Sequence, residues 1–530
     1  MEKLNLQPEY SRNGSYIQLC LPIETDVFIP VDNPVRLLDQ VLDCLDYRPL
    51  YRMYPHRGRK PSTDPKSLFK VLVYAYSQGI YSSRRIEEAC RLNLAFQFLM
   101  RGEKIPDHNT IARFRTGRLS ACVEDLLSQL VQLLYEHEEL SFAHVFIDGT
   151  KIEANANKYS FVWRKAVNKH EARLQDNARL LLTRCFPLDR LPASLTSEAM
   201  TNYLDRLVER CAHEGVVFVH GKGKRKLPMQ RDIEALRRYL ERQAKYEQYN
   251  ALFDGRNSFS KTDTDATFMR LKDDHMRNAQ LKPAYNLQLA VTSEYIVGVD
   301  ISSERSDSLT LKPFLTTLKQ NLGRMFKHVV CDAGYESEEN YTYLDEEGIT
   351  PYIKPSNYEY SKTKTFQNEM AFRLSMEYLA DQDAYRCKGG RLLTYHSDRT
   401  RTSASGFKSQ SKVYRCESCD GCPHLGTCYK GKYAKTITVA ETFDAYRQKS
   451  LENITSDRGI HLRVNRSIQV EGAFGVLKWN YGFTRFLTRG AINVKTECLL
   501  LALGFNINKL HHRIQGHRLK QALFPLKSAG

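Results

Sequence analysis

Three acidic residues of the 530-residue chain stand where a fold could present a carboxylate to an open cleft. Asp148 and Asp332 each follow a short apolar run with strand character, and a glycine follows each within two residues. Glu471 lies instead in a helical segment among small residues. Carboxylates on rigid elements suit Mg2+, and two such ions can activate an attacking oxygen and stabilise a leaving oxygen at a phosphodiester. These residues therefore predict a divalent-metal site for phosphoryl transfer.

Two further acids compete with these three when only residue chemistry is considered. Asp300 follows another apolar run, and Asp307 stands before a helical segment. An aspartate at a strand end is often a turn former, and a glutamate near a helix start often complements the helix dipole. The choice among the five acids therefore stays open at this level.

Elements of both kinds must position these acids. The stretch 144–154 is apolar and then alternating, with Gly-Thr between its halves, which predicts two antiparallel strands with Asp148 at the end of the first. Strand character returns at 283–303, and a helix over 308–322 precedes the short strand that ends at Asp332. This order predicts a mixed sheet with a crossover helix.

Residues 33–135 have helical periodicity. A turn within this region carries Arg113, Arg115 and Arg118 beside an apolar face. Short helices rimmed with arginine suit contact with DNA, although a helical bundle with solvated arginines has the same pattern. We interpret residues 1–137 as a helical DNA-binding domain with these three arginines as candidate contacts.

Polar or strongly basic sequence interrupts the predicted sheet twice. One interruption is helical and contains a basic loop at 221–226, and the other is Cys-rich. After residue 137 the expected segments are a first part of the core (138–162), a helical basic insert (163–280), a second part of the core (281–358), a Cys-rich insert (359–458) and a C-terminal helical part of the core (459–530).

Five of the 13 cysteines gather in the Cys-rich stretch, and the other eight are scattered singly. The five are Cys387, Cys416, Cys419, Cys422 and Cys428. Close Cys-x2-Cys spacing lets two thiolates reach one tetrahedral Zn2+. His396 and His424 are outside candidates, so the set of four ligands stays open. Structural zinc is the prediction, with free thiols or an iron–sulfur cluster as alternatives.

The formal net charge is +17 and 42% of the residues are hydrophobic. A basic excess of this size favours a polyanionic partner, either nucleic acid or an anionic membrane surface. No apolar run approaches the ~20 residues of a bilayer span, and residues 1–11 carry no signal-peptide core. We expect an intracellular globular protein.

Several blocks in order resemble the DDE transposases of bacterial insertion sequences. They read IDGTKIEANANKYS, TDTDATFM, KPAYNLQLAV, VVCDAGYES and VEGAFGVLKW. The stretches PDHNTIARFR and FNINKLHHR also resemble that family, so the likeness spreads from about residue 35 to 512. It is closest to the branch that carries a Cys-rich segment before the third carboxylate.

The resemblance implies an α+β fold with a ribonuclease-H-like core, in which strands bearing Asp148 and Asp332 are neighbours and the helix bearing Glu471 packs beside them. It ranks Asp300 and Asp307 below these three. It also implies Mg2+ or Mn2+ as cofactor, cleavage of DNA at the terminal inverted repeats of the element, and attack of the freed 3′-hydroxyl on target DNA. A homodimer on DNA in the bacterial cytoplasm, associated with the nucleoid, is expected.

Lys478 lies seven residues after Glu471, roughly on the same helical face. Related transposases place a lysine at this spacing against a DNA phosphate. Some also place a tyrosine seven and an arginine four residues before the glutamate, where this chain has Val464 and Ser467. Arg463 and Arg466 are near, but their angles on an α-helix differ from that of the expected arginine, so we assign that role to neither of them.

Two other functions fit the same residues. One is a nuclease or resolvase of the same fold, which cuts DNA without joining it. The other is a catalytically silent, zinc-containing DNA-binding protein derived from a transposase. Strand-transfer assays separate the first from a transposase, and inverted repeats that flank the gene would favour a mobile element over the second.

Overall fold

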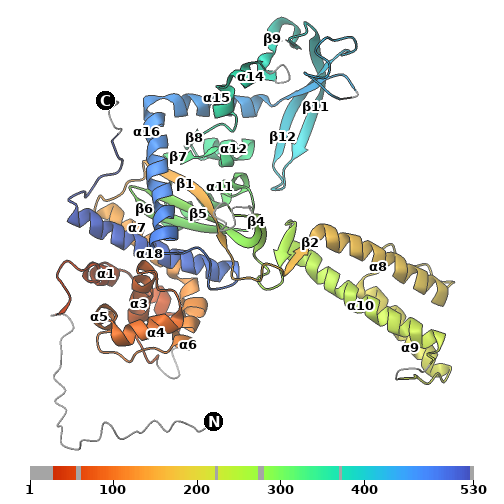
Figure 1. Ribbon diagram of the computed structural model, residues 1–530, viewed down its shortest axis with the longest axis horizontal. Coiled ribbons are helices and arrows are strands. Elements are labelled where there is room, and N and C mark those ends of the chain that lie inside the picture. Colours follow the sequence, from red (N-terminus) through yellow and green to blue (C-terminus); the bar gives the residue numbers. More distant parts are fainter. Residues whose placement is uncertain are drawn as a thin grey trace, which may run out of the picture.

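The computed structural model describes six stretches of the chain (Figure 1). They are residues 28–54, 61–220, 225–271, 280–368, 373–431 and 433–525. Residues 221–224 of the expected basic loop therefore lie outside the described residues. The fold is mixed α+β, with helices around a mixed sheet.

The N-terminal part is helical. Its elements are α1 (Pro34–Asp43), α2 (Arg48–Tyr51), α3 (Pro65–Ser77), α4 (Ser83–Leu92), α5 (Leu94–Met100), α6 (His108–Arg113), the π-helical turn η2 (Phe114–Arg118), the 3-10 turn η3 (Leu119–Ala121) and α7 (Val123–Glu136). N-capping explains where α3 and α6 begin. Asp64 accepts a hydrogen bond from the Ser67 N–H, and Asp107 accepts one from the Thr110 N–H.

The last long helix, α18 (Ala491–Gln515), joins these helices to the sheet, since it packs on α1, α3, α7 and β6. Gly504 makes the approach to α3 possible. A Cβ at this position would lie 2.9 Å from the Ser77 Cβ and 3.0 Å from the Val73 carbonyl oxygen. One continuous hydrophobic core therefore runs from the N-terminal helices into the sheet.

The central sheet has the order β4-β5-β1-β7-β8, and β6 also pairs with β5. Its strands are β1 (His144–Glu153), β4 (Thr267–Arg270), β5 (Leu281–Thr292), β6 (Tyr295–Ser302), β7 (His328–Cys331) and β8 (Thr350–Ile353). β1, β7 and β8 are parallel neighbours, whereas β5 runs antiparallel to β1, β4 and β6. The β5–β6 hairpin turns at Ser293 and Glu294, both in the left-handed region.

The prediction of two strands in 144–154 was wrong, because β1 is one continuous strand. Its residues Phe146–Glu153 pair without a break with Val291–Ala284 of β5. Gly149 and Thr150 continue this ladder instead of turning, since the long partner strand offers hydrogen bonds along the whole stretch. Asp148 therefore stands in the middle of a strand.

Helices cover the sheet. α11 (Leu311–Leu322) links β6 to β7, and α12 (Glu338–Glu346) links the parallel strands β7 and β8. α15 (Glu441–Thr455) lies within the range expected for the Cys-rich insert, yet it packs against β8. α16 (Asp457–Arg466) follows and leads toward β1 and β5.

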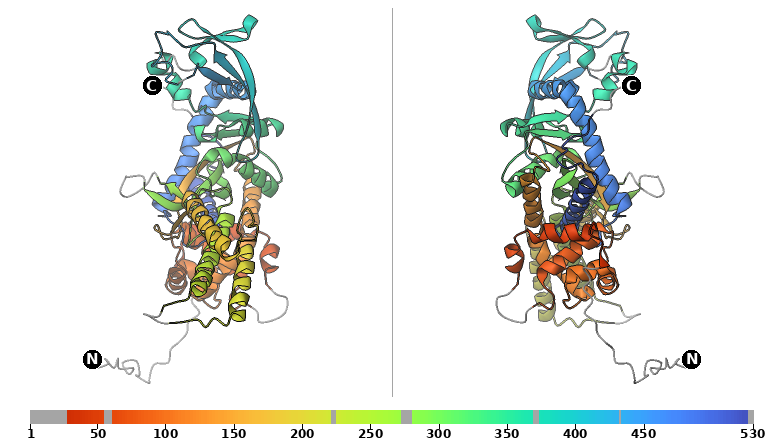
Figure 2. Two further views of the ribbon diagram at one scale, coloured as in Figure 1. Left: turned by 90° about the vertical axis from the view of Figure 1, so that its right-hand side faces the viewer. Right: turned by 90° about the vertical axis from the view of Figure 1, so that its left-hand side faces the viewer.

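Two parts project from this body (Figure 1). One consists of α8 (Arg164–Cys185), α9 (Ser197–His213) and α10 (Pro228–Phe253), which bury a separate hydrophobic cluster, and the pair β2 (Phe161–Trp163) and β3 (Ser258–Ser260) lies at its base. The other is a second sheet of β9 (Glu377–Leu379), β10 (Ala384–Arg386), β11 (Leu392–Thr402), β12 (Lys408–Cys416) and β13 (Thr436–Val439). Figure 2 shows this second sheet and the N-terminal helices at opposite ends of the molecule, with the central sheet between them.

Candidate active site

Asp148 lies in β1, and Asp332 directly follows β7, the parallel neighbour of β1. The last aligned pair between β1 and β7 is Phe146 with Val330, and each aspartate comes two residues later. Asp148 Oδ1 accepts a hydrogen bond from the Gly149 N–H, and Asp332 Oδ1 one from the Gly334 N–H, both at 2.8 Å. The two aspartates therefore lie just beyond the last paired residues of these parallel strands.

The electrostatics of Asp148 reflect burial and the second acid. Burial raises the pKa of Asp148, the positive charge of Arg466 lowers it, and the negative charge of Asp332 raises it again. The net direction is upward, so ionising Asp148 costs free energy in the folded protein.

Glu471 approaches these strands from a helix. It ends the π-helical turn η8 (Ser467–Glu471), which follows α16 and packs on β1 and β5. Arg466 links the acids, because its Nη1 lies 2.9 Å from Asp148 Oδ2 and its Nη2 lies 3.4 Å from Glu471 Oε1. The Glu471 side chain is 59% exposed and therefore faces solvent at the edge of the group.

The sequence analysis set Arg466 aside because the expected arginine stands four residues before the glutamate. In a π-helical turn the backbone hydrogen bonds run from residue i to i+5, so one more residue fits into the turn. The turn η8 therefore brings Arg466, five residues before Glu471, to the glutamate carboxylate. The only sequence signal is the one-residue offset from the family pattern.

Within the described residues, no group of three or more His, Cys, Asp or Glu side chains is arranged to hold a metal ion. This holds for the five clustered cysteines and also for the acids, where the Arg466 guanidinium lies between Asp148 and Glu471. The donor chemistry of these oxygens fits Mg2+ or Mn2+. A cation shared by Asp148 and Glu471 requires the Arg466 side chain to turn away.

The two competing acids differ in place. Asp300 lies on β6, where its Oδ1 is 3.7 Å from the Lys495 Nζ, away from β7. Asp307 instead lies beside Gly334 and Asp332.

Lys478 is half-buried in the π-helical turn η9 (Val476–Asn480), which follows the short α17 (Gly472–Gly475) after Glu471.

The structure separates the three arginines of the helical region. Arg113 and Arg118 are exposed, whereas Arg115 is buried. The Arg115 Nη1 donates to the Tyr81 carbonyl oxygen at 2.8 Å and to the Tyr76 hydroxyl at 3.1 Å. The expectation of Arg115 at a DNA surface is therefore corrected, because the π-helical turn η2 directs this side chain into the protein.

We expect Arg115→Met to lower the free energy of unfolding by about 2–4 kcal/mol, because it leaves buried polar partners unsatisfied. The change also removes a positive charge that acts on Glu497, a buried carboxyl. Arg113→Met is the matched control and should change stability by less than about 0.5 kcal/mol. Urea unfolding measures both, and an Arg115→Met protein of wild-type stability would contradict this internal role.

The five clustered cysteines line one cavity with His424 and Lys435. A Cβ at Gly389 would lie 3.2 Å from the Cys422 Sγ and 3.7 Å from the Cys387 Sγ. Burial and the neighbouring thiols of Cys419 and Cys387 raise the pKa of Cys416 to about 11. Every described cysteine is a free thiol, so none of them is committed to a disulfide.

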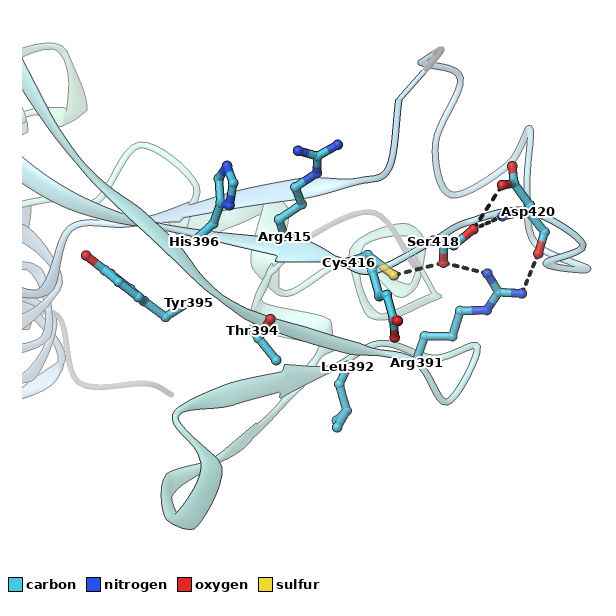
Figure 3. A pocket seen from close by; sticks show the side chains of 10 residues that line it. Arg391, Leu392, Thr394, Tyr395, His396, Arg415, Cys416, Ser418 and Asp420 are labelled. Atoms are coloured by element: carbon cyan, nitrogen blue, oxygen red, sulfur yellow. Dashed lines mark hydrogen bonds between the residues drawn. The ribbon is translucent and has the colours of Figure 1, made fainter.

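A pocket of about 790 Å³ adjoins this cavity along β11 and β12 (Figure 3). Arg391 crosses to the cysteine loop, where its Nη1 donates to the Ser418 carbonyl oxygen at 2.5 Å and its Nη2 to that of Asp420 at 2.6 Å. Arg391 therefore fastens the loop between Cys416 and Cys422 to the start of the hairpin.

Two family profiles match the chain. Residues 386–511 match the family described as "Transposase DDE domain", and residues 23–117 match the one described as "Transposase domain (DUF772)". The first span contains Glu471, and the second covers the N-terminal helices through most of η2. The two matches support a DDE transposase of an insertion sequence.

No curated protein and no solved structure matches the chain. Transposase DDE domains use Mg2+ or Mn2+ and act on DNA, and the match implies a nuclease or transposase enzyme. In the described stretches, no helix of the chain has both the length and the apolar character of a bilayer span.

Proposed function

We propose that this transposase uses Asp148, Asp332 and Glu471 with a divalent metal to cut DNA at the element ends and to join them to target DNA. The observation that carries the proposal is the juxtaposition of Asp148 and Asp332 on parallel strands, with Glu471 joined to Asp148 through Arg466. A shared site for three carboxylates is what phosphoryl transfer by bound metal requires.

The proposal includes a ribonuclease-H-like core. It is supported by the strand order β6-β5-β1-β7-β8, by the antiparallel β1, β5 and β6, and by the parallel β7 and β8. The helical and Cys-rich parts enter this core between β1 and β5 and after β8.

Asp148 and Asp332 would hold the metal from the two strands, and Glu471 would hold it from the helix. The bound metal would supply an activated oxygen nucleophile and a stabilised leaving oxygen. Burial makes the Asp148 charge costly, and a divalent cation would offset that cost. Arg466 offsets part of it already, because its positive charge lowers the pKa of Asp148 against the effect of burial.

DNA contact is proposed for Arg113 and Arg118, which are exposed on the N-terminal helices, and for Lys478 beyond Glu471. The net charge of +17 supports a polyanionic partner. We further propose that two copies act together on a pair of element ends, each of which carries a terminal inverted repeat.

Zinc is proposed for the cysteine cavity. Four thiolates of the five cysteines would close a tetrahedral site with no open position, so this metal would support the fold and not the reaction. The second sheet buries few apolar side chains of its own, which favours an added link of this kind.

Asp148→Asn should stabilise the metal-free protein at neutral pH. A carboxyl whose pKa is raised by folding contributes stability below its unfolded pKa of about 3.9, and this is lost as the pH rises through the folded pKa. We therefore expect a Tm above that of wild type at pH 7.5. The difference in Tm between Asp148→Asn and wild type should become smaller toward pH 4. A Tm of Asp148→Asn below that of wild type at both pH values would contradict the prediction.

The test of the function is a strand-transfer assay with labelled DNA that carries the terminal inverted repeat from the flanks of the gene, in Mg2+ or Mn2+. Joined products support a transposase. Cleavage without joining would support a nuclease of the same fold, and specific binding without cleavage would support a silent DNA-binding protein.

A further inference from the structure

The outer part of the β11–β12 hairpin is a two-stranded ribbon. β10 pairs with β11 only as far as Thr394, and β13 pairs with β12 only from Lys412 onward. Among the described residues, 399–402 and 408–411 therefore pair only with each other, and we call them the outer ribbon. The turn of the hairpin reaches α12, where the Ser405 hydroxyl donates to a carboxylate oxygen of Glu339 (Figure 1). The tip thus lies against the helix that follows Asp332.

The register of the hairpin divides its side chains between two faces. Residues opposite each other in an antiparallel pair share a face, and successive residues along a strand alternate between faces. Arg399 lies opposite Ser411, and Arg401 lies opposite Ser409, so both arginines share one face. We call this side of the hairpin the arginine face, and its paired residues are Thr394, Ser397, Arg399, Arg401, Ser409, Ser411, Val413 and Arg415.

The opposite face of the hairpin packs on the rest of the second sheet. It carries Tyr414 and Cys416, which are buried in the hydrophobic cluster of that sheet. Lys412 lies on the same face and forms an ion pair with Glu441 at the start of α15, with 2.8 Å between Nζ and Oε1. Because these contacts use the opposite face, the arginine face is turned outward.

The arginine face carries charge of one sign only. None of its eight paired residues is acidic, whereas the opposite face carries Asp398 between lysines. Arg399, Arg401 and Arg415 are exposed, and within the described stretches no ion pair is found for any of them. Figure 3 shows His396 pointing to the same side of the hairpin as Arg415. A face that serves only solubility mixes both signs, so this one fits an anionic partner.

We propose that the arginine face binds the phosphate backbone of duplex DNA, with Arg399 and Arg401 of the outer ribbon as contacts. This inference rests on the proposed function, because it takes DNA as the substrate. Guanidinium groups suit phosphate oxygens, and a two-stranded ribbon is narrow enough to enter a DNA groove. Since the tip of the hairpin contacts α12, one duplex can reach both the arginine face and the carboxylates at Asp332.

The test measures the affinity of the full-length protein for a short fluorescent duplex without the terminal repeat, over a range of salt and without Mg2+. Each arginine on a phosphate contributes about 0.9 to the slope of log affinity against log salt. Arg399→Gln/Arg401→Gln should therefore lower that slope by about 2 and weaken binding about tenfold at low salt. Lys408→Gln/Lys412→Gln is the matched control, because it removes the same charge from the opposite face, and it should nearly keep the wild-type slope.

An equal loss of slope in both double variants would overturn the inference, because net charge alone would then explain the binding. A wild-type slope in a folded Arg399→Gln/Arg401→Gln protein would also overturn it. If that protein does not fold, Arg399→Gln and Arg401→Gln are tested singly. Each should then lower the slope by about 1, and two unchanged slopes overturn the inference.

The same assay separates this inference from the proposed function. If the wild type binds and cuts element-end DNA while the arginine variants bind like the lysine control, only the role of the arginine face fails. A wild type that binds no DNA would overturn the proposed function with it.

Discussion

Asp148→Asn, Asp332→Asn and Glu471→Gln are each expected to bind element-end DNA normally and to lose cleavage and strand transfer in Mg2+. Each change removes one charged metal ligand and keeps the shape of the side chain. Bound metal contributes several kcal/mol of transition-state stabilisation, so the loss should be on the order of 10³-fold or more. Gel electrophoresis of labelled DNA measures cleavage and joining, and a mobility-shift assay measures binding.

Asp300→Asn is the control for this series, because Asp300 is also a partly buried acid of the same sheet but is directed toward Lys495. It should keep activity within a few-fold of wild type. A folded variant at Asp148, Asp332 or Glu471 that keeps near-normal activity would remove that residue from the site. A loss of DNA binding in step with cleavage would point to a change of fold instead.

Removal of zinc is expected to unfold the Cys-rich sheet and to leave the central sheet folded. The second sheet buries only seven apolar residues in its cluster, so a metal link there would carry much of its stability. Structural zinc is worth roughly 10–16 kcal/mol in small zinc domains. We expect about one zinc per chain by elemental analysis, and rapid proteolysis within residues 377–439 after chelation.

Serine variants of the five clustered cysteines identify the ligands, since four should lose zinc and one should keep it. Cys44→Ser is the matched control, because Cys44 is an exposed thiol far from the cluster in the chain. Protein purified without chelator that contains no zinc and resists proteolysis equally with and without chelator would contradict the zinc proposal. An absorption spectrum typical of an iron–sulfur cluster would show that the cysteines bind that cluster and not zinc.

Much of the fold followed from local pattern. Apolar runs predicted the strand that precedes Asp332 and strand character over 283–303, and helical spacing predicted the helices within 33–135 and the helix over 308–322. The misassignment of β1 has a clear cause, because Gly149-Thr150 has turn chemistry and only the long partner strand β5 keeps it extended. Pairing over more than a hundred residues of sequence separation is invisible to a local reading of the chain.

The candidate site was predictable in part. The family resemblance selected Asp148, Asp332 and Glu471, and the structure brings Asp148 and Asp332 together on neighbouring strands. The role of Arg466 depended on a π-helical turn, which the sequence does not announce. The burial of Arg115 depended on which way another such turn directs it. For both Arg466 and Arg115, the sequence did not reveal that a single turn of the helix is π-helical.

The most direct measurement is the anomalous scattering of Mn2+ in crystals of the protein bound to element-end DNA. The account predicts an anomalous peak at ordinary metal–oxygen distance from carboxylate oxygens of Asp148 and Asp332, beside Glu471, with the Arg466 guanidinium turned away from the gap that it now fills. A well-ordered complex with Mn2+ bound elsewhere, and with Arg466 still between Asp148 and Glu471, would contradict the claim that these acids form the catalytic metal site.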